Sequence, residues 1–179
     1  NEQRFVDTLQ QVMLASHNIL VNYMTPLGLH HIMGYGNHYG PAPWYDKAPR
    51  ADWNPVYFHK ADPAGIAFDR TAAGSNALAQ YQPAVRQQFE NMQNCPEAFL
   101  LWFHHVPWTF NMQSGNTLWE ELCYKYYSGA DSVKWMQRSW NGLRKYIDAE
   151  RFKQVQMLLN IQAEEAVWWR NACLLYFQT

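Results

Sequence analysis

Apolar residues recur every three or four positions in the first part of the chain, between about residues 2 and 22. The set comprises Phe5, Leu9, Val12, Met13, Ile19 and Leu20. This spacing puts them on one face and predicts an amphipathic helix. Thr25-Pro26 and Gly28 should end it, because the residue before a proline is disfavoured in the α region and glycine commonly follows a helix.

A longer helix is predicted at the other end of the chain, with Asp148 as its N-cap. Its main apolar seam comprises Phe152, Val155, Leu159, Gln162, Ala166, Trp169, Cys173 and Tyr176. A second face carries Leu158, Ile161, Trp168 and Leu175. A helix that is apolar on two faces must be covered on both. The sequence leaves two possibilities for what buries the second face: the rest of the same domain or a partner chain.

Shorter elements are predicted between residues 75 and 108. Ser75 is a suitable N-cap for one helix, and Pro83 fits the first turn of the next. Their inward positions are Leu78 and Tyr81 in the first helix, and Val85, Phe89 and Met92 in the second. The segment PEAFLLWFHHVPW, residues 96–108, is a short buried helix or strand, and its periodicity does not decide between them.

Thr117-Leu118-Trp119-Glu120 is a capping-box sequence. It predicts a helix from Thr117 to about Ser128, which Gly129 stops. Asp131 or Ser132 then caps a further helix. The inward residues of that helix are Val133, Met136, Trp140, Leu143 and Ile147.

Between Tyr23 and Thr71 the chain shows no helical or strand period, yet it is rich in Gly, Pro, His and aromatic residues. Irregular segments this long are uncommon in compact domains and are usually functional or disordered. The aromatic content argues against disorder. Trp53–His59 suggests a short strand, which Pro55 confines to a sheet edge. The predicted fold is therefore one mainly α domain over residues 1–179, with an irregular region from about 23 to 73.

Charge and cysteine content exclude several classes of protein. A net charge of -1 without a basic run lacks the electrostatic footprint of a nucleic-acid binder. No stretch approaches the roughly 18 apolar residues of a membrane span, and no basic run favours an anionic membrane surface. Cys95, Cys123 and Cys173 lie far apart without a CxxC pair, so we interpret them as small buried hydrophobes rather than as a disulfide or zinc framework.

The histidines invite a metal hypothesis, because six of the seven are grouped. They are His30-His31, His38, His59 and His104-His105, with His17 alone. Adjacent histidines point to different faces of a regular element, and the chain has no HExxH spacing. Core or interface roles are therefore favoured over a metal site. No cofactor is expected either, since GYGNHYG, residues 34–40, lacks the spacing and flanking elements of a dinucleotide-binding turn.

The carboxylates of the irregular region allow two interpretations. They are Asp46, Asp52, Asp62 and Asp69, and the nearby cations are Arg50, Lys60 and Arg70. Paired carboxylates in a loop could perform the acid and base steps of a glycosidase. Alternatively, Asp52 and Asp62 cap turns while Asp69 pairs with Arg70. Turn and packing roles are favoured.

Nine Trp and eleven Tyr make the chain unusually aromatic. Trp44 and Trp53 stand in loop context beside Pro, Gly and Tyr, where a flat ring can face an opening and pack on the C–H groups of a sugar. The remaining tryptophans lie in or beside predicted helices. We interpret those as core or interface residues.

Several blocks of the sequence resemble a known family. These blocks are YMTPLGLHHIM, HYGPAPW, RADWNPVYFHKAD, GIAFDRT, WFHHVPW, TLWEELCYKYY and CLLYFQT. Together, from about His17 to the last residue, they resemble the C-terminal region of the α-glucuronidases of glycoside hydrolase family 67. The resemblance implies an enzyme that removes α-1,2-linked glucuronic acid, or its 4-O-methyl form, from xylo-oligosaccharides with inversion.

The resemblance also implies a parent protein with a small N-terminal domain, a (β/α)8 barrel and a mainly helical C-terminal domain. The catalytic carboxylates of the family lie on the barrel, and no residue of this chain matches them. The implied partners of this chain are its own barrel, a second copy in a homodimer and the oligosaccharide. Trp53, and after it Trp44, would contribute to an aromatic sheath around the uronic acid.

Two alternatives remain, which are a purely structural or dimerisation domain and a carbohydrate-binding module. The chain opens on NEQRF without an initiator Met, signal peptide or transit pattern, and it stops inside an apolar helical pattern. We therefore expect a fragment of a longer protein. Its sequence does not indicate a compartment.

Overall fold

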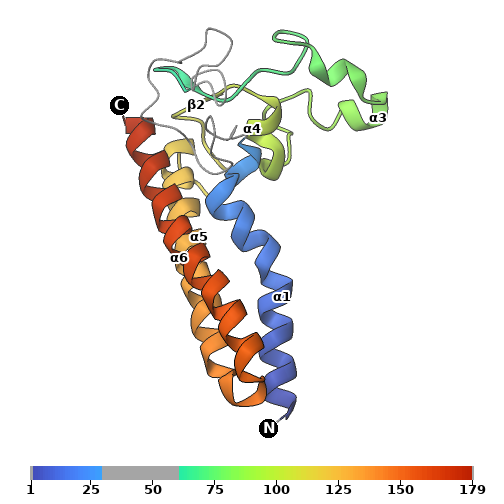
Figure 1. The fold of residues 1–179 in the computed structure, drawn as a ribbon. Coiled ribbons are helices and arrows are strands. Elements are labelled where there is room, and N and C mark those ends of the chain that lie inside the picture. Colours follow the sequence, from blue (N-terminus) through green and yellow to red (C-terminus); the bar gives the residue numbers. More distant parts are fainter. Residues whose placement is uncertain (1, 30–60, 179) are drawn as a thin grey trace, which may run out of the picture. The chain divides into compact units, whose positions relative to one another are not determined.

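The computed structural model describes residues 2–29 and 61–178, and the predicted strand at Trp53–His59 lies outside them. The mainly α prediction is confirmed: the long elements are the helices α1 (Glu2–Met24), α5 (Leu118–Gly142) and α6 (Ala149–Gln178) (Figure 1). The chain divides into two compact units. Unit 1 comprises Asn1–Met24 and Lys125–Asn171, and unit 2 comprises Thr25–Tyr124 and Ala172–Thr179.

Unit 1 is built on an aromatic cluster contributed by three helices. Trp140, Leu143 and Phe152 are its buried members. The rings of Trp140 and Phe152 stack with centroids 5.8 Å apart, and the Trp140 indole N–H donates to the Phe152 carbonyl oxygen at 3.2 Å. Around them pack Phe5, Leu9, Tyr146, Ile147, Val155 and Leu159. Residues that the spacing predicts to face inward, among them Phe5, Trp140 and Phe152, therefore pack in one common core.

The predicted break at Gly129 is wrong, because α5 runs through this position without interruption. Consequently neither Asp131 nor Ser132 caps a helix. The glycine serves a close approach instead. A Cβ built at Gly129 would lie 2.8 Å from the backbone nitrogen of Tyr23 and 2.9 Å from its Cβ, so only glycine lets α1 pass this near. Helix propensity alone suggested a stop, and tertiary packing overrides it.

The predicted helix termini at the capping box and at Asp148 are confirmed. Thr117 and Glu120 exchange hydrogen bonds: the Thr117 backbone N–H donates to a Glu120 carboxylate oxygen at 2.8 Å, and the Glu120 N–H donates to the Thr117 hydroxyl at 3.3 Å. At the start of α6 the Arg151 backbone N–H donates to Asp148 Oδ1 at 3.0 Å. Both termini follow from residues within one turn, which is why the sequence predicts them.

Besides the ends of α5 and α6 that belong to it, the described part of unit 2 contains short elements. They are the 3-10 helices η1 (Pro26–Gly28), η2 (Ala77–Gln80) and η3 (Glu97–Phe99), the helices α3 (Pro83–Arg86) and α4 (Leu100–Phe103), and the strands β1 (Gly65–Ile66) and β2 (Val106–Pro107). The strands pair antiparallel, with Ile66 opposite Val106. Within the irregular region predicted for about 23–73, the described residues also form two short elements that the sequence did not predict, η1 and β1.

Three shorter predictions for unit 2 need correction or refinement. Ser75 caps no helix, because Asn76 holds the position before η2 in a left-handed conformation and makes no capping bond. Pro83 does occupy the first turn of α3, but this helix already ends at Arg86. Residues 96–108 form a 3-10 turn, one turn of α-helix and a strand in succession, so both alternatives hold for parts of the segment.

The described residues include no helix with the length and apolar character needed to cross a membrane. Cys95 and Cys173 are buried, Cys123 is half-buried, and all three are free thiols. The interpretation as small buried hydrophobes is confirmed for Cys95 and Cys173, whereas Cys123 is only half-buried. Burial raises the pKa of the Cys95 thiol to about 11, which keeps it protonated and unreactive.

Candidate functional site

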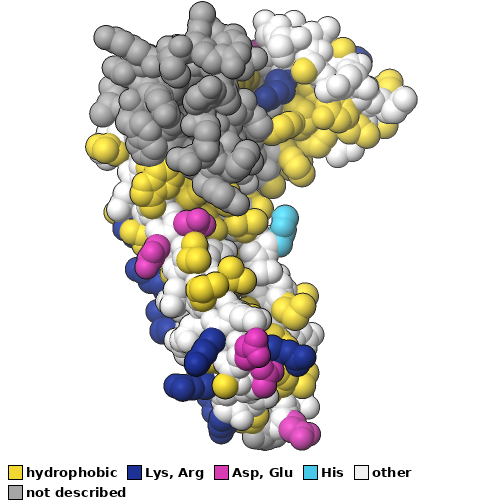
Figure 2. Space-filling model, viewed as in Figure 1, with side chains coloured by type: hydrophobic (Ala, Val, Ile, Leu, Met, Phe, Trp, Pro, Cys, Tyr) yellow, Lys and Arg dark blue, Asp and Glu magenta, His cyan; other side chains and the backbone are white. Residues whose placement is uncertain are grey.

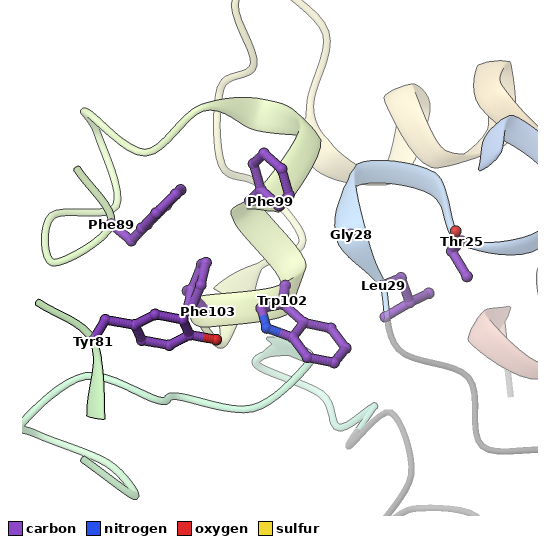
Figure 3. Close-up of a pocket in the computed structure, with 8 residues that line it drawn as sticks. All are labelled: Thr25, Gly28, Leu29, Tyr81, Phe89, Phe99, Trp102 and Phe103. Atoms are coloured by element: carbon purple, nitrogen blue, oxygen red, sulfur yellow. The ribbon is translucent and has the colours of Figure 1, made fainter. Parts of the chain in front are cut away.

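Trp44 and Trp53, the predicted sugar contacts, lie outside the described residues, as do His30, His31, His38, His59, Asp46 and Asp52. Their roles stay predictions. The described part of unit 2 offers a different candidate, which is a cavity of about 410 Å³ with a largely apolar wall. We call it the aromatic cavity. Its lining residues are Thr25, Gly28, Leu29, Tyr81, Phe89, Phe99, Trp102 and Phe103 (Figure 3).

Stacked rings form one side of the aromatic cavity. The Phe89 and Phe103 rings stack with centroids 4.5 Å apart, while Phe99 meets Phe89 edge-on at 5.6 Å. Tyr81 meets Phe103 edge-on at 6.0 Å. Such pairs contribute about 0.5–1.5 kcal/mol each beyond the area they bury. The wall is thus held by ring contacts among residues 81–103 and does not depend on a ligand.

The opposite side of the aromatic cavity comes from η1, and Gly28 brings it close. This residue has a φ of +79°, which favours glycine. An added Cβ would lie 2.9 Å from the Ala98 carbonyl oxygen and 3.2 Å from the Trp102 Cβ. Leu29, fully buried, follows it into the wall. The PLG sequence after α1, predicted only as a helix stop, therefore also seats η1 against η3 and α4.

Arg70 supports Trp102 from outside the cavity lining. Its guanidinium donates to the Trp102 carbonyl oxygen and lies 4.7 Å from the centroid of the Trp102 ring. Burial lowers the pKa of Arg70, because the charged guanidinium loses part of its hydration. The favoured structural role of Arg70 holds, but the partner is Trp102 and not Asp69. Asp69 instead accepts from the Thr71 N–H at 2.8 Å and hydroxyl at 2.6 Å.

The paired histidines take different structural roles. One ring nitrogen of His105 lies 2.7 Å from the Ala67 carbonyl oxygen, and the other lies 3.5 Å from Asp62 Oδ1. The Asp62 carboxylate also accepts from the N–H groups of Ala64 and Gly65, at 2.9 and 3.0 Å. Asp62 therefore stabilises a turn, which is the role that the sequence favours for it.

His104 is buried behind the cavity wall. Its ring bonds the backbone carbonyl of Phe89, while Nε2 has no partner. Burial lowers the pKa of His104, because the charged form loses its hydration; the Phe89 carbonyl and the charge of Asp69 oppose this shift. A neutral imidazole donating through Nδ1 fits this setting. His104 thus anchors the segment that carries Phe89.

Among its described lining residues, the aromatic cavity has no carboxylate, imidazole or amine for acid–base catalysis. The polar side-chain groups of these residues are the Thr25 hydroxyl, the Tyr81 phenol and the Trp102 indole N–H. Within residues 2–29 and 61–178, no three His, Cys, Asp or Glu side chains cluster as metal ligands would. Sequence reasoning missed the cavity as a site. The signal was the density of aromatic residues from Tyr81 to Phe103, which we interpreted as core.

Comparison with known proteins places the chain in context. The family model described as "Glycosyl hydrolase family 67 C-terminus" matches residues 1–179. The chain is 34% identical over 174 residues to "Probable alpha-glucuronidase A" of Aspergillus clavatus, covering 96% of this chain and 20% of that relative. It is 30% identical over 173 residues to "Alpha-glucuronidase A" of Aspergillus tubingensis, covering 95% of this chain and again 20% of the relative. The chain spans about a fifth of the length of these curated relatives.

Proposed function

Because this chain belongs to glycoside hydrolase family 67, as the C-terminal part of an α-glucuronidase, we propose that the whole enzyme removes α-1,2-linked glucuronic acid or its 4-O-methyl form from xylo-oligosaccharides with inversion. The family match over residues 1–179 carries this proposal. The chain acts as one C-terminal domain that packs on the catalytic barrel, forms a dimer and contributes part of the substrate pocket.

The chain contributes no catalytic carboxylate in this proposal. Support comes from the acidic residues of the described part, several of which are engaged in local structure. Asp62 and Asp69 hold turns, and Glu120 and Asp148 cap helices. Residues 1–179 alone should release no glucuronic acid. A coupled uronate assay on the isolated chain and on the whole enzyme tests this, and release by the isolated chain would overturn it.

Dimerisation draws support from the second face of α6. Leu158, Ile161 and Trp168 are 60%, 46% and 38% exposed, although the sequence places them on an apolar stripe. Exposed apolar stripes of this kind mark interaction surfaces. A second copy is the proposed cover. Replacing Leu158 by Asp in the whole enzyme should shift its mass in solution from dimer to monomer, as measured by light scattering.

Trp53 is the proposed sugar contact, with Trp44 as the second candidate. Removing the Trp53 ring should lower kcat/KM roughly tenfold, since about 1.4 kcal/mol of lost stacking corresponds to that factor. The thermal unfolding midpoint and the dimer mass should stay unchanged. Tyr124→Ala on α5 is the control, because Tyr124 is 63% exposed and belongs to neither proposed site; it should leave kcat/KM at the wild-type value. An unaltered kcat/KM for Trp53→Ala would favour a purely structural role for the irregular region.

A free-standing carbohydrate-binding module would behave differently. It would bind xylo-oligosaccharides without the rest of the enzyme. Titration calorimetry of residues 1–179 with an aldouronic oligosaccharide distinguishes a free-standing binding module from a domain that acts only within the whole enzyme. We expect no measurable heat of binding.

A further inference from the structure

We propose that the aromatic cavity is a socket for an apolar side chain from the catalytic portion of the same polypeptide. The inference rests on the proposed function and adds to it the place on this chain where the two parts lock together. It commits to one occupant, which is a Leu, Met, Phe or Trp side chain of the enzyme's own remaining sequence.

The chemistry of the lining selects that occupant. Of the eight described lining residues five are aromatic, and none of the eight is a Lys, Arg, His, Asp or Glu. A sugar entering this space would give up the hydration of several hydroxyl groups and find few partners, at a cost of about 1–3 kcal/mol for each unpaired group. An anion or cation would lose more. An apolar side chain has no such hydration to lose, and the burial of its apolar surface favours binding.

The rim of the cavity has the exposure expected of a surface that is covered in the whole enzyme. Phe99 is 49% exposed, Tyr81 37% and the neighbouring Val85 41%. Figure 2 shows apolar side chains gathered over the part of unit 2 that contains α3 and α4. A soluble protein rarely leaves large apolar residues together in this way without a partner.

The cavity is also prepared for binding. Phe89 and Phe103 hold each other by stacking, and Gly28 seats η1 against the far side. A volume of about 410 Å³ lies within the roughly 300–1,000 Å³ typical of binding pockets and accommodates one or two large side chains. A rigid, preformed pocket spares the cost of ordering its walls on binding. These features are those of an anchoring site for a single large side chain.

The choice between the same polypeptide and a second copy follows from effective concentration. The chain covers 20% of its relatives, so about four-fifths of such an enzyme lies outside it on the same polypeptide. Covalent linkage presents a tethered group at roughly millimolar effective concentration. The proposed second copy is assigned to the second face of α6, and before dimerisation it is far more dilute than a tethered group. The tethered occupant therefore fills the cavity first.

Photo-crosslinking in the whole enzyme tests the proposal. Phe99→p-benzoylphenylalanine keeps the phenyl ring of Phe99 and extends it by a photoreactive benzoyl group at the exposed rim. On irradiation we expect a product that keeps the mass of one polypeptide, with the attachment site mapped by mass spectrometry outside residues 1–179. Leu158→p-benzoylphenylalanine is the control and should not attach to the same segment. Products of twice the mass, or attachment only within residues 1–179, would refute the socket.

A second pair of variants measures the consequence of emptying the socket. Phe99→Asp in the whole enzyme should make proteolysis between this chain and the catalytic portion about tenfold faster or more, while the dimer mass stays unchanged. Leu158→Asp should have the opposite pattern. Loss of the dimer in Phe99→Asp would show that a second copy occupies the cavity and would overturn the inference. Glucuronic acid release by the unmodified enzyme tests the proposed function separately, since the cross-link map does not depend on activity.

Discussion

Replacing Gly129 by Ala should destabilise the chain, although alanine is the better helix former. In the interior of a helix the exchange is worth about 1 kcal/mol in favour of alanine. The added Cβ, however, would lie 2.8 Å from the Tyr23 nitrogen and 3.1 Å from the Asn22 carbonyl carbon. These are backbone atoms, which cannot rotate away as a side chain can. Overpacking of this kind costs about 1–3 kcal/mol, and we place this site at the upper end.

The net expectation for Gly129→Ala is a loss of about 1–2 kcal/mol in the free energy of unfolding. Gly142→Ala is the matched control, because it lies at the end of the same helix and its added Cβ meets nothing within 4 Å. That variant should gain up to about 1 kcal/mol. At about 2–4 °C per kcal/mol for a chain of this size, the midpoints should move in opposite directions.

Urea unfolding followed by circular dichroism measures both Gly129→Ala and Gly142→Ala. Each variant adds one methyl group to the same helix, so helix propensity alone predicts that both raise the free energy of unfolding. A Gly129→Ala chain as stable as wild type, or more stable, would refute the close approach of α1 and α5 at Tyr23.

Three further outcomes are expected from the same chain. The pKa of His104 is lowered in the folded state, so the unfolded state binds the proton more readily and the free energy of unfolding should fall as pH drops below about 6.5, by up to about 1.4 kcal/mol per pH unit. His104→Gln should reduce this pH dependence, as measured by urea unfolding at pH 7 and pH 5. An equal change in unfolding free energy between the two pH values for wild type and variant would count against the role of His104. Thr117→Ala should lower the free energy of unfolding by about 1 kcal/mol, because the capping box is lost. Ser132→Ala, within α5, should change it by no more than a few tenths of a kcal/mol. Similar losses in both variants, measured by urea unfolding, would contradict the continuous helix. Arg70→Lys should lower the free energy of unfolding by about 1 kcal/mol, since an ammonium group cannot both stack on the Trp102 ring and donate to the Trp102 carbonyl oxygen as the planar guanidinium does. An unchanged midpoint of thermal unfolding would show that only the charge matters.

The sequence by itself determined the features that depend on neighbours within a turn or two of chain. The helix of residues 2–24 ends at Thr25-Pro26 because proline restricts the residue before it, and the caps at Thr117 and Asp148 use side chains three residues from their partners. The two-faced apolar pattern of α6 is equally local, but only the structure shows that Leu158 and Ile161 on the second face are exposed. Family membership followed from uninterrupted sequence blocks and was confirmed by comparison.

Only the tertiary structure decided what depends on distant segments. Gly129 has the propensity of a helix stop, and nothing nearby in sequence shows that α1 passes against it. The aromatic cavity joins residues 25–29 to residues 81–103, so its lining cannot be distinguished from ordinary core by periodicity. Arg70 donates to the Trp102 carbonyl oxygen rather than pairing with the adjacent Asp69, because α4 lies beside Arg70 in the folded chain. In each case the deciding contact spans tens of residues, and its geometry is set by packing rather than by local propensity.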